Sequence, residues 1–224
     1  MSEYLLEARG LRKVYKEGPV TVEAVRDVSL QVKAGESVAI MGPSGSGKTT
    51  LLSMLGCILK PTKGDVIIEN KVIKWDVDDI SRLRLSSIGF VFQSFNLFSA
   101  LTALENVEVA LNLRGIKGLE ARRQAREMLE AVGLGDRVDF LPRDLSGGQK
   151  QRISIARALV NHPPLILADE PTGNLDSKTG HAIIELLRDL VVKERRSVVV
   201  VTHDTRMMDV VHRVYHLEDG VLVS

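Results

Sequence analysis

The chain has 224 residues, of which 44% are hydrophobic and 26% charged, and its formal net charge is +1 at pH 7. These proportions are typical of an ordinary soluble globular protein with a sizeable core. A charge so close to zero argues against a dedicated nucleic-acid binder, which carries a basic excess. The single cysteine, Cys57, excludes an internal disulfide and fits a reducing compartment, and its apolar surroundings predict a buried thiol.

No targeting or membrane-spanning segment is expected. The first ten residues contain Glu3, Glu7 and Arg9 and no apolar run, unlike a secretory signal. No stretch approaches the ~20 apolar residues that cross a bilayer. If the protein works at a membrane, we expect another chain to hold it there.

Roughly the first 35 residues and residues 66–73 alternate apolar and polar side chains, with turn signals at Gly18-Pro19 and Asn70. Alternation of this kind predicts an antiparallel sheet with one buried face. The runs 38–41, 88–92, 165–168 and 198–202 are instead continuously apolar. Helical patterns over 48–59 and 179–192 lie between them, so parallel strands buried on both faces are expected. A short last strand is expected at Val221–Val223.

The turn after residues 38–41 fits the phosphate-loop pattern G-x-x-x-x-G-K-[ST] without a mismatch. Its backbone N–H groups and the helix that follows would hold the phosphates of ATP. Lys48 would reach the β- and γ-phosphates, and the Thr49 hydroxyl would bind Mg²⁺. The predicted nucleotide-binding residues here are Gly42, Pro43, Ser44, Gly45, Ser46, Gly47, Lys48, Thr49 and Thr50.

Residues 94–145 have a helical pattern. One amphipathic face is formed by Ala121, Ala125, Met128, Leu129 and Val132, and Gly133 stands where a left-handed C-cap belongs. The opposite face carries Arg122, Arg123 and Arg126. No aromatic residues are interleaved with these arginines, so a solvated face is favoured over nucleic-acid binding.

Leu145-Ser146-Gly147-Gly148-Gln149 precedes a helical run that includes Ile153, Ala156 and Leu159. A capping serine and two glycines at a helix N-terminus would make a second phosphate site. As a helix cap alone, the segment would need no second glycine.

Asp169 and Glu170 follow the apolar run 165–168. Asp169 would hold Mg²⁺ directly or through its water shell, and Glu170 would polarise the attacking water. The alternative is that both carboxylates only solubilise the end of a strand.

A phosphate loop, then LSGGQ, then an apolar strand ending in Asp-Glu resembles the ATP-binding cassette of ABC proteins. The resemblance implies a head-to-tail dimer, with each ATP between the phosphate loop of one copy and Ser146, Gly147, Gly148 and Gln149 of the other. Gln93 would contact Mg²⁺ and water, and His203 the γ-phosphate. Asn174-Leu175-Asp176 would cross the dimer interface.

Tyr15 occupies the place of the aromatic residue that stacks on adenine in this family. Packing into the core is the alternative for this ring.

The implied fold is α/β: a P-loop NTPase (RecA-like) core with a mostly parallel sheet, an antiparallel β subdomain and an inserted α-helical subdomain. We expect one domain over residues 1–224. Residues 1–93 and 151–224 would form the core with the β subdomain, and 94–150 the helical subdomain.

Residues 43–48, 55–57, 60–62, 95–107 and 168–177 look like the macrolide-exporter and lipoprotein-release group. Its members power a separate membrane permease by ATP-driven dimer closure. That implies a peripheral protein on the cytoplasmic face of the inner membrane, linked through the permease to a periplasmic adaptor or outer-membrane component, with no nucleic-acid partner. An importer ATPase is the alternative, followed by a soluble ABC ATPase. The short stretch between Thr49 and Leu145 leaves no room for the coiled coils of the DNA-repair type.

Apolar side chains crowd the segment after Gln93, at Phe95, Leu97, Phe98 and Leu101. Exposed apolar patches mark binding sites, so this segment is expected to receive a cytoplasmic helix of the permease. Packing inside the helical subdomain is the alternative.

Overall fold

A four-stranded antiparallel sheet is formed mainly by the first third of the chain. In the computed structural model, which describes residues 4–223, β1 (Tyr4–Glu17) pairs with β2 (Val20–Lys33) and with β4 (Lys63–Ile68). The short β5 (Lys71–Val72) pairs with β4 at the edge of this sheet. The alternation of the sequence therefore predicted this sheet correctly.

A second, six-stranded sheet has the order β10-β9-β3-β8-β7-β6. Its strands β3 (Ser37–Met41), β6 (Ile88–Val91), β7 (Leu165–Asp169), β8 (Ser197–Thr202) and β9 (Arg213–Glu218) are parallel. Only β10 (Val221–Val223) is antiparallel. Every residue of β3, β7 and β8 is buried, as continuous apolar runs predict. The α/β fold class is thus confirmed.

One core joins the two sheets, and α1 (Lys48–Leu55) contributes Leu51, Leu52, Met54 and Leu55 to it. The helix ends four residues before the predicted boundary. Gly56 is its C-cap, and Cys57 has a φ of +53°. A right-handed helix cannot continue through this left-handed conformation. Cys57 is buried as expected, and burial raises the pKa of its thiol to about 12.

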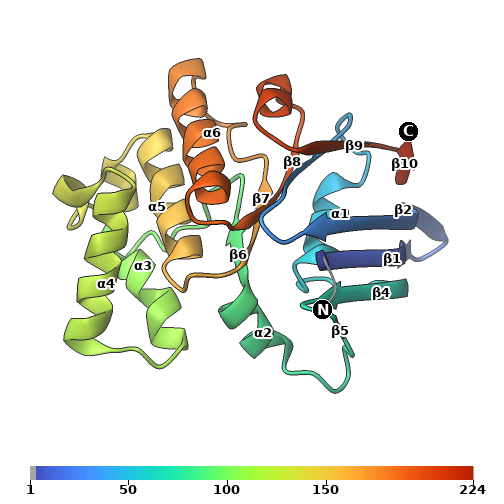
Figure 1. Ribbon diagram of the computed structural model, residues 1–224, viewed down its shortest axis with the longest axis horizontal. Helices are drawn as coiled ribbons and strands as arrows, with labels where there is room; N and C mark the ends of the chain where they lie inside the picture. The colour runs from blue at the N-terminus through green and yellow to red at the C-terminus, as the bar shows by residue number, and fades with distance from the viewer. Residues whose placement is uncertain (1–3, 224) are drawn as a thin grey trace.

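The remaining long helices lie at the other end of the molecule from the four-stranded sheet (Figure 1). α3 (Ala103–Leu113) and α4 (Gly118–Ala131) pack on α5 (Gly147–Leu159), while α6 (Ser177–Val192) covers the six-stranded sheet. Ile153 of α5 belongs to the helical core, and Ile155 of the same helix belongs to the core under α6. The predicted subdomain boundary after residue 150 falls inside α5, and α5 contributes to both cores. The division into subdomains stays a prediction.

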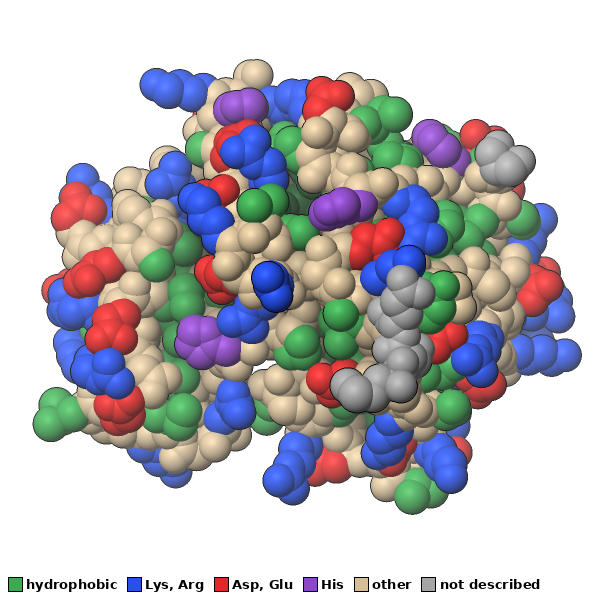
Figure 2. Space-filling view, viewed as in Figure 1, with side chains coloured by type: hydrophobic (Ala, Val, Ile, Leu, Met, Phe, Trp, Pro, Cys, Tyr) green, Lys and Arg blue, Asp and Glu red, His purple; other side chains and the backbone are tan. Residues whose placement is uncertain are grey.

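α4 has the predicted amphipathic face: Ala121, Ala125 and Leu129 are buried, and Gly133 has a φ of +74°. On the other face Arg123 forms ion pairs with Glu120 and Glu127. Figure 2 shows cationic and anionic side chains intermixed over the visible surface. None of the helices within residues 4–223 is both long and apolar enough to cross a bilayer.

Candidate functional site

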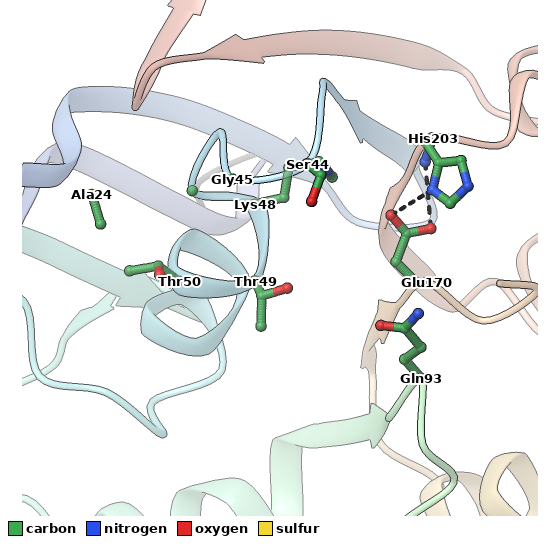
Figure 3. A pocket seen from close by; sticks show the side chains of 10 residues that line it. Ala24, Ser44, Gly45, Lys48, Thr49, Thr50, Gln93, Glu170 and His203 are labelled. Atoms are coloured by element: carbon green, nitrogen blue, oxygen red, sulfur yellow. Dashed lines mark hydrogen bonds and ion pairs between the residues drawn. The ribbon is translucent and has the colours of Figure 1, made fainter. Parts of the chain in front are cut away.

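The predicted catalytic residues gather where the central parallel strands end. β3 leads into the phosphate loop, β7 into Glu170, and β8 into His203. The carboxyl ends of parallel strands share one edge of a sheet, where ligand sites form. A cavity of about 570 Å³ opens there (Figure 3), lined by Ala24, Ser44, Gly45, Gly47, Lys48, Thr49, Thr50, Gln93, Glu170 and His203.

The phosphate loop is shaped by close backbone contacts. A Cβ atom at Gly42 would lie 2.0 Å from the Leu217 carbonyl oxygen, and one at Gly47 would lie 2.2 Å from that of Ala24. Gly47 also has a φ of +99° and caps α1 without any side-chain acceptor for the first N–H groups. Those N–H groups and the helix dipole favour an anion at this point.

Lys48 is buried, and its Nζ donates to the carbonyl oxygens of Gly42 and Pro43, each at 2.9 Å. The ammonium group is therefore folded over the loop beside the N-terminus of α1. Gly42, Pro43 and Ser46 shape the loop without lining the cavity.

Thr49 and Asp169 meet directly: the Thr49 hydroxyl donates to Asp169 Oδ1 at 3.0 Å. Burial raises the pKa of Asp169, and the Thr49 hydrogen bond opposes that rise. Mg²⁺ in nucleotide sites prefers one or two carboxylates together with phosphate oxygens. A hydroxyl and a carboxylate at this spacing fit that ion, and Gln93 lines the same cavity.

Glu170 and His203 form a pair on the other side of the cavity. His203 Nδ1 lies 3.0 Å from Glu170 Oε1, and the Thr202 hydroxyl donates to Glu170 Oε2 at 3.0 Å. The Glu170 side chain is 11% exposed and that of His203 69%. Glu170 has a φ of +43°, a conformation rare for a non-glycine residue, and backbone strain of this kind gathers at functional sites. The contacts with His203 and Thr202 fix the orientation of the Glu170 carboxylate.

Gln93 follows β6 after one intervening residue, so the strand ends slightly earlier than predicted. Its carbonyl oxygen accepts a hydrogen bond from Asn174 Nδ2 at 3.0 Å. Ala24 is a lining residue that the sequence did not indicate. It comes from β2 of the other sheet, and no local motif marks an alanine brought in by tertiary packing.

The LSGGQ residues do not line this cavity. Ser146 caps α5 in a reciprocal capping box with Gln149. A Cβ atom at Gly148 would lie 2.1 Å from Thr179 Cγ2, so close helix packing already requires this glycine. The second glycine therefore has a packing reason that the sequence did not show, and a phosphate-binding role for this segment stays a prediction. Asp176 caps α6 by accepting a hydrogen bond from the Thr179 N–H, and it also lies outside the cavity lining.

Tyr15 lies on β1 and is 43% exposed, with Lys13 Nζ 5.3 Å from its ring centroid. Core packing is thus excluded, and adenine stacking stays a prediction. In the segment after Gln93, Leu97 packs against the helical core while Phe98 is 51% exposed. Packing inside the helical subdomain is therefore confirmed for Leu97, while the permease contact stays a prediction for Phe98.

Comparison with known proteins agrees with this geometry. The family model described as ABC transporter matches residues 25–173. An uncharacterized ABC transporter ATP-binding protein of Thermotoga maritima is 51% identical over 217 residues, covering 96% of this chain and 92% of that protein. The macrolide export ATP-binding/permease protein MacB of Shewanella sp. (strain ANA-3) is 42% identical over 225 residues, covering 100% of this chain but 34% of MacB.

Among solved structures, the chain is similar to the dimeric post-hydrolysis state of the ATP-binding cassette MJ0796 of Methanocaldococcus jannaschii, bound to ADP and Pi. The TM-score is 0.91 at 46% identity, covering 98% of this chain and 97% of that one. The chain belongs to the ABC transporter family. Within that family it is an ATP-binding subunit with the ATPase fold.

Proposed function

We propose that this protein hydrolyses MgATP to power a separate membrane permease of the macrolide-exporter or lipoprotein-release type. The observation that carries the hydrolytic role is the two-sided cavity, with Lys48 and Thr49 on one side and Glu170 and His203 on the other. An anion-binding helix end facing an oriented carboxylate suits the attack of water on a terminal phosphate.

Each side of the cavity has its own role in this proposal. Lys48 and the loop N–H groups bind the β- and γ-phosphates, and Tyr15 stacks on adenine. Thr49, Asp169 and Gln93 would hold Mg²⁺, which neutralises developing phosphate charge when bound. Glu170 receives the proton of the attacking water, since its carboxylate is fixed by Thr202 and His203. His203 is the more exposed partner and reaches the γ-phosphate.

We further propose that two copies act together. Ser146 is exposed at the N-terminus of α5 and lies outside the cavity of its own chain. In this proposal the N-terminus of α5 binds the phosphates of the ATP that a partner copy holds, and Asp176 lies at the interface. The dimeric MJ0796 structure supports this arrangement by similarity.

The exporter assignment and the location at the cytoplasmic face of the inner membrane are supported by the similarity to MacB, whose name joins an ATP-binding and a permease function. Phe98, a large apolar side chain that is 51% exposed, is the residue we propose at the centre of the permease contact.

The hydrolytic role is tested with Glu170→Gln. The amide keeps the size of the side chain and removes its basicity, so turnover should fall about 10²–10⁴-fold. ATP affinity, measured by equilibrium binding, should change little because the phosphate loop is untouched. Lys48→Ala is the matched comparison and should lose affinity as well. A Glu170→Gln protein that turns over ATP near the wild-type rate would remove Glu170 from this role.

A further inference from the structure

The segment that follows Gln93 has an uncommon backbone. Phe95 has a φ of +62° and Asn96 a φ of +48°. Two successive non-glycine residues in the left-handed region are strained, and for a bulky residue such as Phe95 this conformation is an outlier. Such a conformation persists only where the surrounding structure holds it.

Arg157 of α5 holds both residues. Its Nη2 donates to the Phe95 carbonyl oxygen at 2.9 Å, and its Nη1 donates to that of Asn96 at 2.7 Å. Within residues 4–223 these two carbonyl groups are its only hydrogen-bond partners, and no carboxylate pairs with it. Burial lowers the pKa of the guanidinium. Arg157 is partly buried, and a guanidinium that has lost part of its water and has no counter-charge is stabilised by both carbonyl groups.

The far end of the same segment is anchored to α3. Asn106 is fully buried, accepts from the Phe98 N–H at 2.8 Å and donates to the carbonyl oxygens of Phe98 and Leu101 at 3.1 Å and 3.0 Å. The segment is therefore attached at both ends to the helical group, with the exposed Phe98 side chain between the two anchors.

Gln93 stands two residues before the strained pair, and Figure 3 shows its side chain pointing toward Glu170. The Phe95 ring also lies 3.9 Å from the point where a Cβ of Gly147 would be, at the first turn of α5. α5 thus contacts the backbone beside Gln93 through the Arg157 guanidinium and also through the Phe95 ring.

We infer that Arg157 is a positioning residue, which holds the segment after Gln93 in its strained form and so sets the place of Gln93 in the cavity. It also makes the Phe98 surface and α5 move together. The part of this inference that concerns turnover rests on the proposed function. The part that concerns the backbone does not.

The test compares Arg157→Met and Arg157→Lys with a control on the same helix. Arg152→Met is suitable, because Arg152 Nη1 donates to the Val132 carbonyl oxygen, and within residues 4–223 no hydrogen bond or ion pair joins Arg152 to the segment. Amide hydrogen exchange is measured first, on full-length protein without nucleotide. Arg157→Met should speed exchange in residues 94–99 by about tenfold or more, because the strained backbone then opens locally. Arg157→Lys, which can bond one carbonyl group, should give a smaller increase, and Arg152→Met none there.

Steady-state ATPase kinetics form the second measurement. A displaced Gln93 should lower the kcat of Arg157→Met about tenfold, while the KM for ATP stays within about twofold because the Lys48 loop is intact.

Unchanged exchange over residues 94–99 would overturn the inference whatever the rates. Faster exchange with wild-type kcat would overturn the link to Gln93. If Arg157→Met fails to fold, Arg157→Lys decides by the same two criteria. A wild-type protein without turnover would overturn the proposed function instead, and the exchange result would still decide whether Arg157 holds the segment.

Discussion

At the scale of single residues, Asp204 ties the loop after β8 to the segment after β7. It accepts hydrogen bonds from Arg206 Nη2 at 2.6 Å and from the Thr172 hydroxyl at 2.9 Å. Arg206 in turn donates to the Ser177 carbonyl oxygen at 3.0 Å. The guanidinium of Arg206 is the main reason that the pKa of Asp204 is lowered to about 2. His203 is the neighbouring residue, so this ion pair supports the loop that presents it.

Asp204→Asn should therefore destabilise the protein by about 1 kcal/mol at pH 7, a modest cost because Arg206 is partly exposed and screened. A lowered carboxyl pKa stabilises the folded state above the unfolded pKa, and this contribution is lost as the pH falls through the folded pKa. The difference between wild-type and variant should thus shrink between about pH 4 and pH 2. Urea unfolding across that range measures it. A difference that stays constant with pH would show that the ion pair contributes nothing.

The phosphate-loop residues and Glu170 could be predicted from the sequence because each belongs to a short pattern at the end of an apolar strand, whereas His203 was indicated only by the family resemblance. Arg157 and Ala24 could not. Their contacts join segments that lie far apart in the sequence, and neither residue type carries a motif of its own.

At the scale of elements, the contact between α5 and α6 depends on Gly148. The absent Cβ lets Thr179, in the first turn of α6, approach the start of α5. Ser146, two residues before Gly148, is held separately by its capping box with Gln149.

Gly148→Ala should cost about 1–3 kcal/mol, since the added methyl group would lie 2.1 Å from Thr179 Cγ2. The double variant Gly148→Ala/Thr179→Ser removes that methyl group and should regain most of the loss. Thermal unfolding of the single and double variants measures the coupling. Additive effects of the two substitutions would contradict a direct contact.

The elements themselves show where sequence patterns are sufficient. β3, β7 and β8 were predicted from continuous apolar runs, because strands buried on both faces leave that pattern. α2 (Ile80–Ser87) and β9 were missed. Each has partly exposed, charged positions, so neither repeats a clear period. The helix boundary of α1 was wrong because Cys57, a non-glycine residue, adopts the left-handed conformation that ends it.

At the scale of the whole molecule, the proposed composite site predicts complementation between variants. Ser146→Arg should abolish hydrolysis and leave the nucleotide affinity of the monomer intact, because Ser146 is remote from its own cavity. Lys48→Ala should also be inactive, because it loses the phosphate contact of its own cavity while its Ser146 is intact. In a two-fold dimer, mixing the two proteins should restore at most one of the two sites. ATPase assays of the mixture, with each variant alone as the control, would show no recovery if each chain completed its own site.

The dimer itself is the central claim. Glu170→Gln binds ATP without consuming it in this account, so ATP should remain between two copies and hold them together. The most direct measurement is the molar mass of Glu170→Gln by size-exclusion chromatography with light scattering, with and without ATP. The account predicts twice the chain mass of 24.7 kDa with ATP and the single chain mass without it. A mass of one chain at saturating ATP, with the nucleotide bound, would contradict it.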